Sequence, residues 1–260
     1  MKHLLLVMSF VLFATFTTAA SAYETVDVKN GATIKGVVKV KGSVPSDESI
    51  AIDKNQEICG TAQNMNTYMV YDSRMKNAVV FIDNPQQGKP LPKDSVVSLN
   101  IRRCRVEPLV SVGFVGGKFV FKNEDNILHT LQLKLWLEYQ RLVSSRPLKD
   151  GATIYNIAFP TQDKQIEKPI KEYYRYHTDT GFIRVTSNSD PWIRGFVYIF
   201  DHPYAAVTDG RGEFVLDNLP PGEYTLTAWH EDAGIQKKNI KVTPSGTMEI
   251  EIEFGPQGEK

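Results

Sequence analysis

The chain has 260 residues, of which 42% are hydrophobic, and its 30 lysines and arginines balance 30 aspartates and glutamates. Because these charges are balanced and interspersed, there is no electrostatic reason to expect a nucleic acid or an anionic membrane surface as partner. The length is sufficient for two small β domains or one large one.

The first 22 residues are typical of a secretory signal peptide. Lys2 gives a positive start, residues 4–16 form an uncharged apolar run, and Ala-Ser-Ala at 20–22 offers small residues to a signal peptidase. We expect cleavage before Tyr23 and a mature protein in the periplasm or outside the cell. A membrane anchor is the alternative, but the apolar run is shorter than the roughly 20 residues of a spanning helix.

Alternation of apolar and polar residues with period two dominates the rest of the chain, and no segment after the signal predicts an amphipathic helix. Residues 46–67 are polar and are predicted to form a loop. Short strands are predicted in the first half at 34–40, 78–82, 96–101, 109–114 and 118–121.

The clearest strand is predicted over 130–141, where leucines at alternate positions form a core face. Trp136 falls on the opposite, polar face, and an exposed indole there suits sugar stacking or a protein interface. Tyr174 and Tyr176, which share one face of a later segment, could extend this binding surface. The alternative is that Trp136 belongs to the core beneath the polar loop 144–152.

Further strands are predicted in the last third at 183–185, 196–200, 206–207, 214–215, 224–228 and 248–254. Turn sequences separate them, notably Asp-Gly-Arg-Gly at 209–212 and Pro-Pro-Gly at 220–222. His202 and His230 lie in or beside such turns and are predicted to satisfy local polar groups. The tail 256–260 is expected to fray. Many short strands joined by regular turns predict an all-β protein built of β-sandwiches.

The chain contains only two cysteines, Cys59 and Cys104. In an oxidising compartment the expected state of a single pair is a disulfide, and two separate buried thiols are the alternative.

Two stretches carry a resemblance to a known family. The first runs from Cys-Arg-Val-Glu-Pro at 104–108, through Gly-Gly at 116–117, to Asn-Glu-Asp-Asn-Ile-Leu-His at 123–129. The second begins with Asp-Pro-Trp-Ile-Arg-Gly at 190–195 and extends to Trp-His-Glu at 229–231. Together they resemble exported bacterial proteins with a plastocyanin-like (cupredoxin) module followed by a carboxypeptidase-regulatory-like module.

The resemblance implies a fold for each part of the mature chain. A cupredoxin-like Greek-key β-sandwich is expected over 23–200. A smaller transthyretin-like, carboxypeptidase-regulatory-like β-sandwich is expected over 201–255. Modules of the second kind are often grouped with carbohydrate-binding-like folds, which is an analogy of fold and not evidence of a site.

The resemblance also implies a copper site, from which this sequence departs. In the family, the segment that ends at His129 supplies one copper ligand, and a C-x-x-H-x-x-M loop supplies three others. The corresponding positions here are Ser187, Asp190 and Ile193. A blue copper site needs two imidazoles, a thiolate and a weak axial thioether, so it is expected to be lost, and no cofactor is expected. His129 and Asp190 are too few donors for a structural zinc site, and a hydrogen-bonded polar cluster is the expected outcome.

No catalytic motif is found: there is no G-x-S-x-G, no H-E-x-x-H, no phosphate-binding glycine loop and no spare cysteine. The sequence therefore predicts an exported non-catalytic binding or scaffolding protein whose β-sandwiches contact an envelope protein or a carbohydrate. The alternative is a periplasmic cupredoxin-type electron-transfer protein, which is the role that relatives with intact copper sites imply.

Overall fold

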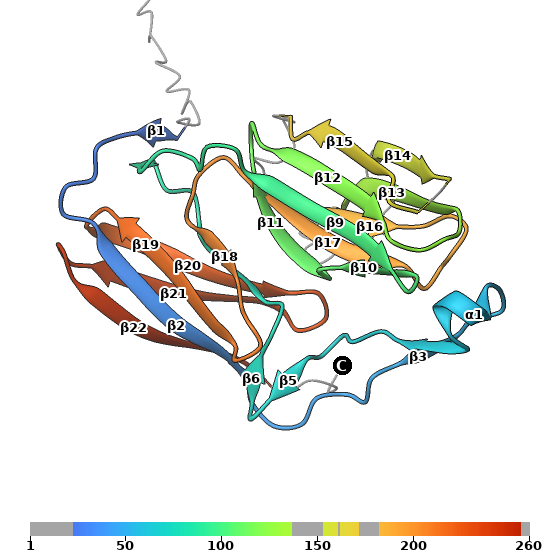
Figure 1. The fold of residues 1–260 in the computed structure, drawn as a ribbon. Coiled ribbons are helices and arrows are strands. Elements are labelled where there is room, and N and C mark those ends of the chain that lie inside the picture. Colours follow the sequence, from blue (N-terminus) through green and yellow to red (C-terminus); the bar gives the residue numbers. More distant parts are fainter. Residues whose placement is uncertain (1–22, 137–152, 161, 172–181, 256–260) are drawn as a thin grey trace, which may run out of the picture.

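The computed structural model describes residues 23–136, 153–160, 162–171 and 182–255. These residues fold into two β-sandwiches that lie side by side (Figure 1). The predicted all-β fold class is therefore confirmed. In the described part of the chain, the only helix is the single turn α1 (Gln56–Cys59), and no helix is long and apolar enough to cross a bilayer.

The first sandwich consists of a four-stranded and a five-stranded sheet. The four-stranded sheet has the order β10 (Arg105–Glu107), β9 (Val96–Arg102), β12 (Lys118–Asn123), β15 (Gln165–Pro169). The five-stranded sheet has the order β11 (Val110–Phe114), β17 (Arg194–Phe200), β16 (Phe182–Thr186), β13 (His129–Trp136), β14 (Thr153–Phe159). The alternating apolar residues of both sheets, such as Leu99, Phe121, Leu133 and Val185, meet in one buried core, as period-two patterning requires.

The second sandwich also has two sheets. One has the order β18 (Ala205–Val207), β7 (Val79–Ile82), β20 (Gly222–His230), β21 (Gly234–Val242). The other has the order β19 (Glu213–Leu219), β2 (Ala32–Val40), β6 (Arg74–Met75), β5 (Val70–Tyr71), and β22 (Thr247–Phe254) pairs with β2 in parallel. Ile34, Val38, Leu226 and Phe254 are among the fully buried residues of its core.

This pairing corrects the predicted division of the chain at residue 200. Residues 23–200 were expected to form the first sandwich, but β2 pairs with β19 and β22, and β7 pairs with β18 and β20. The buried residues of β2, together with Val80 and Ile82 of β7, therefore lie in the core of the second sandwich. Turn signals along a sequence do not indicate such long-range pairing. The prediction placed β2 and β7 in the first sandwich because they come early in the chain.

A long connection between β2 and β5, residues 41–69, crosses from the second sandwich to the first and back. It contains β3 (Ser49–Ala51), α1 and β4 (Ala62–Asn64), where the sequence predicted only a polar loop. We call this connection the strap. The disulfide between Cys59 and Cys104 fastens the strap to the first sandwich and confirms the predicted pairing.

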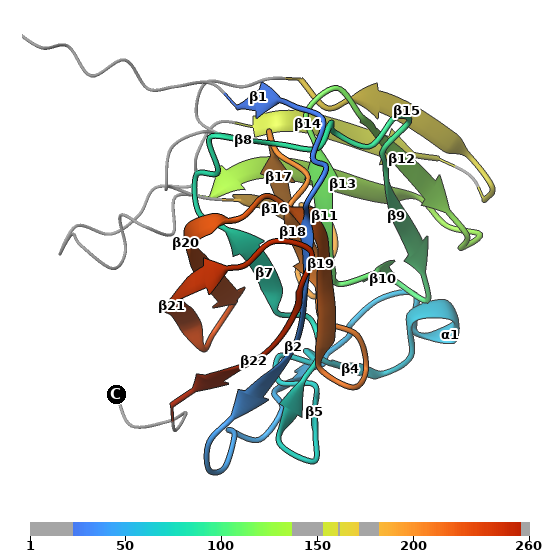
Figure 2. The ribbon, with the colours of Figure 1, turned by 90° about the vertical axis from the view of Figure 1, so that its left-hand side faces the viewer.

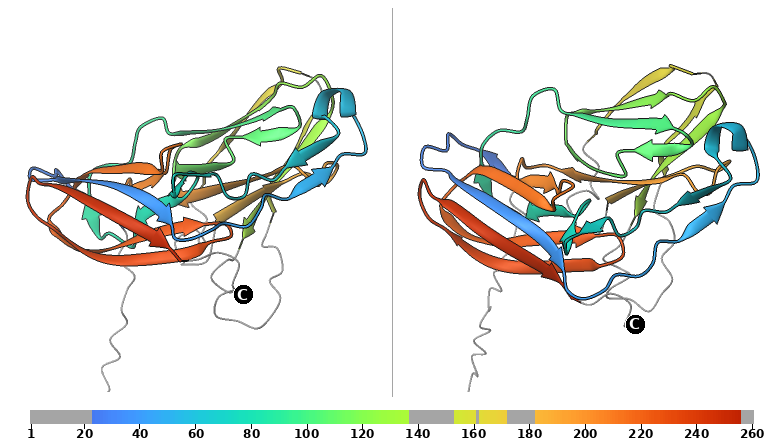
Figure 3. Two further views of the ribbon diagram at one scale, coloured as in Figure 1. Left: turned by 90° about the horizontal axis from the view of Figure 1, so that it is seen from below. Right: turned by 60° about the horizontal axis from the view of Figure 1, so that its bottom comes forward.

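The two sandwiches share an apolar contact surface. Phe81 and Trp229 of the second sandwich pack against Phe200 and Phe196 of the first, with ring centroids 5.1 and 5.9 Å apart. The view from the side of the second sandwich shows β7 and β20 with β11 and β17 behind them (Figure 2). The strap spans the two sandwiches along one edge (Figure 3). A short parallel pair, β1 (Glu24–Thr25) with β8 (Gln87–Gly88), lies at the end of the second sandwich opposite β5 and β6 (Figure 1).

Several predictions concern residues outside the described ranges and remain predictions. These are the signal peptide 1–22, the tail 256–260, the loop 144–152, Tyr174 and Tyr176. Trp136 ends β13, but its side chain is likewise outside the description, so its place on a surface or in the core stays open.

Candidate functional site

The four positions that resemble copper ligands lie at one end of the first sandwich. His129 begins β13, Ser187 follows β16, and Ile193 precedes β17. Because β16 pairs with both β13 and β17, these strand ends and the loop between β16 and β17 are brought together. The sheet register thus places Asp190, in that loop, beside His129.

The carboxylate of Asp190 connects these side chains. Its Oδ2 lies 3.4 Å from Nδ1 of His129, 3.5 Å from Oγ of Ser187 and 2.8 Å from Oγ of Ser189. His129 and Asp190 are almost completely buried. Ile193 differs: its N–H donates to the Asp190 carbonyl at 2.9 Å, while its side chain packs in the hydrophobic core. Three of the four positions therefore converge on one polar cluster.

The other ring nitrogen of His129 contacts a second carboxylate. Nε2 lies 3.0 Å from Oδ2 of Asp125, which the sequence interpretation did not identify. Asp125 in turn accepts the backbone N–H groups of Arg103 and Cys104 at 2.7 and 2.8 Å, which fixes its orientation. The spacing of four residues between Asp125 and His129 was the one sequence signal that could have indicated this contact. His129 is thus held between two buried carboxylates.

Lys54 of the strap neutralises part of this negative charge. Its Nζ lies 3.2 Å from Oδ1 of Asp190, donates to the Ser189 carbonyl and lies 5.8 Å from the Trp192 ring centroid. Burial raises the pKa of Asp190, but hydrogen bonds from Ser189, Lys54 and His129 and the charge of Lys54 outweigh burial. The pKa of Asp190 is therefore lowered, and the group is a carboxylate at neutral pH.

These donors do not fit a blue copper ion. Ser187 offers a hydroxyl where a thiolate is needed, Asp190 offers a carboxylate in place of the second imidazole, and Ile193 offers no donor atom. Ligand atoms of Cys104, Asp125 and His129 do lie within 4.8 Å of one another. However, the sulfur of Cys104 is bonded to Cys59, so it is not a thiolate.

Comparisons with known proteins give partial matches. Residues 199–250 match the family model fn3_3, described as polysaccharide lyase family 4, domain II. No curated protein matches the chain. Among solved structures, the chain is similar to amicyanin from Paracoccus versutus, with 15% identity over 42% of this chain and 85% of amicyanin and a TM-score of 0.29.

Two other solved structures give similar values. A purple cupredoxin from Nitrosopumilus maritimus has 15% identity over 40% of this chain and 99% of its own, with a TM-score of 0.26. The copper-containing nitrite reductase from Thermus scotoductus SA-01 has 12% identity over 45% of this chain, with a TM-score of 0.28. The match spans only 24% of the nitrite reductase. Because these TM-scores are low, the similarities are not used as evidence for the fold, which is described from the strand pairing alone.

A second polar cluster lies where the sandwiches meet. Arg194, at the start of β17, forms an ion pair with buried Glu231 at 2.5 Å and donates to the strap through the Met65 carbonyl and the Thr67 hydroxyl. Burial raises the pKa of Glu231 to about 7, although Arg194 opposes this shift. Arg194 therefore joins both sandwiches and the strap, a role that the sequence interpretation did not find.

The two histidines predicted to satisfy turns are buried and accept backbone hydrogen bonds. Nδ1 of His230 accepts the N–H of Ala233 at 3.3 Å, and the ring stacks on Tyr68 with centroids 5.2 Å apart. Nδ1 of His202 accepts the N–H of Tyr204 at 3.2 Å. Burial is the main cause that lowers the pKa of each histidine to about 4. Both are therefore neutral in the folded protein at neutral pH.

Lowering the pH from 6.5 to 4 is expected to destabilise the protein. In this window the unfolded chain binds protons at His202 and His230 that the folded chain does not, so the free energy of unfolding falls. Glu231 acts in the opposite direction, because its raised pKa makes the folded chain bind the extra proton between about pH 4.5 and 7. Since two histidines oppose one glutamate, we expect a net loss on the order of 2–3 kcal/mol.

Urea denaturation at several pH values measures this loss. The variant His230→Asn keeps a hydrogen-bond acceptor near the position of Nδ1 but cannot titrate. We expect it to be less stable than wild type at pH 7 and to lose less stability on acidification. If the free energy of unfolding of this variant falls with pH as steeply as that of the wild type, His230 does not contribute to the acid destabilisation.

Proposed function

We propose that the protein is an exported, non-catalytic binding or scaffolding protein of the cell envelope. Its first sandwich would be a cupredoxin-like module in which a polar cluster replaces the blue copper ion. The observation that carries this proposal is the state of His129, whose two ring nitrogens each contact a buried carboxylate, Asp125 and Asp190. A ring nitrogen must give up such a contact before it can bind a metal.

The replaced site has a structural use that supports the proposal. Asp190 binds His129 of β13, Ser189 of its own loop and Lys54 of the strap. The cluster therefore fastens three separate segments of the chain at one end of the first sandwich. A site that binds copper for electron transfer would need these side chains as ligands instead.

The arrangement also gives no support to hydrolytic chemistry. A serine nucleophile needs a base within hydrogen-bond reach. Among the described residues, His129 contacts carboxylates on both sides, and the hydroxyl of Ser187 reaches Asp190 instead. The cluster thus lacks the contact between serine and histidine that a catalytic triad requires.

Two observations favour a partner-binding role for the second sandwich. The family model that matches 199–250 is named for a domain of a polysaccharide lyase, and the sequence resembles modules grouped with carbohydrate-binding-like folds. An exported module of this kind, without catalytic residues, would present a surface to a carbohydrate or to an envelope protein.

Capture from native envelope tests this function. The mature chain, fixed at its C-terminus to a resin, is expected to enrich one protein or one polysaccharide fraction reproducibly. A chain denatured and coupled in the same way is the control. If native and denatured chains retain the same material, the binding role is wrong.

A further inference from the structure

A groove opens in the second sandwich where two paired strands separate. β7 pairs with β20 as far as Ile82, and the N–H of Asp83 still donates to the Thr225 carbonyl at 2.9 Å. Asn84 then adopts a positive φ of 46°, and Pro85 has no N–H to continue the ladder. The chain therefore turns away from β20 and leaves a space between residues 83–87 and the start of β20.

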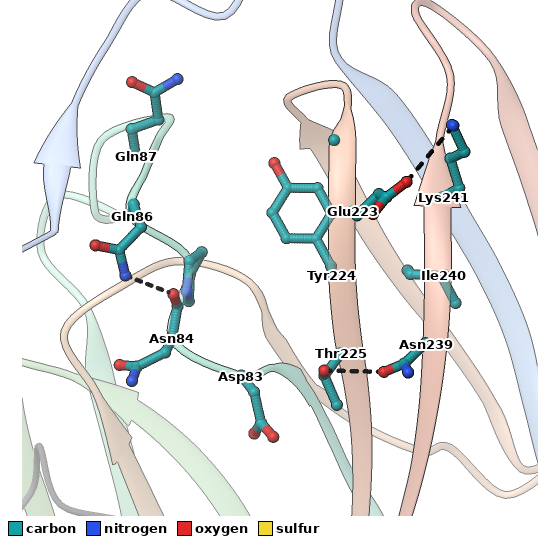
Figure 4. Close-up of a pocket in the computed structure, with 12 residues that line it drawn as sticks. Asp83, Asn84, Gln86, Gln87, Glu223, Tyr224, Thr225, Asn239, Ile240 and Lys241 are labelled. Atoms are coloured by element: carbon teal, nitrogen blue, oxygen red, sulfur yellow. Dashed lines mark hydrogen bonds and ion pairs between the residues drawn. The ribbon is translucent and has the colours of Figure 1, made fainter.

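This groove is of ligand-binding size and is lined mainly by polar side chains. Its volume of about 760 Å³ falls within the range of small-molecule sites. Figure 4 shows residues 83–87 on one side and the side chains of β20 and β21 on the other. Six of the lining residues carry a planar amide or carboxylate: Asp83, Asn84, Gln86, Gln87, Glu223 and Asn239.

Several amide groups in the groove have unused hydrogen-bonding capacity. Asn239 accepts the hydroxyl of Thr225 through Oδ1 at 3.1 Å, which leaves its NH₂ group without a partner among the described residues. The side chains of Asn84 and Gln87 likewise form no hydrogen bond within the described part of the chain. Paired donors and acceptors on planar amides match the adjacent hydroxyl groups of a sugar ring.

Tyr224 supplies a fixed aromatic ring among these amides. Its hydroxyl donates to the Pro220 carbonyl at 3.0 Å, and the ring packs against Gly222, where a Cβ would lie only 3.2 Å from it. The half-buried ring stands between Gln86 and Glu223 in Figure 4. A rigid aromatic ring beside amides can stack against the C–H face of a sugar.

The charges of the groove are compensated internally. Asp83 pairs with Lys237 at 2.7 Å, and Glu223 pairs with Lys241 at 3.5 Å. A charged ligand would have to compete with these pairs, whereas an uncharged ligand would leave them intact. The apolar side chains of the lining are those of Pro85, Tyr224 and Ile240, and they do not form a deep pocket for a hydrophobic peptide side chain.

From these contacts we propose that the groove binds a segment of a neutral polysaccharide, with Tyr224 as the stacking residue and Asn84, Gln87 and Asn239 as hydrogen-bonding residues. This inference rests on the proposed binding function and assigns it a site and a ligand class.

Calorimetric titration of the mature chain tests this proposal with hexasaccharides of glucose, mannose and xylose, each in β-1,4 linkage. At least one is expected to bind, and Tyr224→Ala is expected to weaken that binding at least about tenfold. Asn239→Ala is expected to weaken it by about three- to tenfold without a change in melting temperature, because this side chain is exposed.

Tyr71→Ala is the matched control. Tyr71 is 80% exposed in β5. β5 lies at the opposite end of the same sandwich from β1, which pairs with Gln87 of the groove (Figure 1). The Tyr71 variant is therefore expected to bind like wild type. If Tyr224→Ala fails to fold, Asn239→Ala still decides the question.

Three results would overturn the inference: no binding of any neutral hexasaccharide, equal losses in the Tyr71 and Tyr224 variants, or preference for an acidic peptide or a uronic-acid hexasaccharide. If envelope capture still yields a specific partner, only the groove assignment fails. If capture fails as well, the proposed function fails with it.

Discussion

The triple variant Ser187→Cys, Asp190→His, Ile193→Met is expected to turn blue with Cu(II), whereas the wild-type protein stays colourless. These changes restore a thiolate, a second imidazole and an axial thioether at the spacing that a blue copper site needs, with His129 as the fourth ligand. The intense absorption of such a site comes from charge transfer between the thiolate and copper, which the wild type cannot supply.

The structure supports the placement on which this result depends. Oδ2 of Asp190 is within 3.5 Å of both His129 and Ser187, so new side chains at these positions would converge on one point. Replacing Asp190 removes the partner of Lys54, but the Lys54 side chain is 43% exposed and can turn to solvent. Methionine is close to isoleucine in volume, so the change at buried Ile193 should cost less than about 1.5 kcal/mol.

The double variant Asp190→His, Ile193→Met is the matched control, because it keeps Ser187 and lacks the thiolate. It is expected to show no charge-transfer band. A colourless triple variant should first be checked by counting thiols, since the new cysteine could exchange with the disulfide between Cys59 and Cys104. If that disulfide is intact and the variant is still colourless, the placement of the loop is wrong. A wild type that is blue as isolated would overturn the proposed function.

Local signals in the sequence were sufficient for the fold class, and the family resemblance was needed for part of the site. The alternating leucines of the strand predicted over 130–141 indicated β13, whose core face is buried as expected. The resemblance, aligned on Pro-Trp at 191–192, implied that Ser187 and Asp190 lie near His129, and the three do lie together. The strand could be predicted because its pleat is determined by neighbouring residues.

The features that the sequence analysis missed are contacts between distant segments. Lys54 contacts Asp190 from the strap, most of which was predicted to be a polar loop. Arg194 of the first sandwich contacts Glu231, which follows β20 of the second. The assignment of β2 to the second sandwich depends on its pairing with β22, more than 200 positions later in the chain. A single charged residue or a short strand has many possible partners, and only the folded backbone selects one.

The disulfide has the largest expected effect on stability. It joins Cys59 of the strap to Cys104 after β9, over a separation of 45 residues. A crosslink that closes a loop of this length lowers the entropy of the unfolded chain enough to stabilise the fold by about 4 kcal/mol. Both cysteines are buried, so their removal also disturbs packing around the end of the first core.

The double variant Cys59→Ala, Cys104→Ala is therefore expected to lose about 4 kcal/mol in free energy of unfolding, measured by urea denaturation. Mass spectrometry of the exported wild type without reductant should show no free thiol. The loss should begin in the strap, because after removal of the crosslink only non-covalent contacts hold the strap to the first sandwich, namely the packing of buried Ile52 in the first core and polar contacts such as that of Lys54 to Asp190. Limited proteolysis should then cut the variant within 41–69 before it cuts β2 or β22, whereas the wild type should resist. A variant with unchanged stability and an intact strap would contradict this prediction and show that the non-covalent contacts hold the strap without the disulfide.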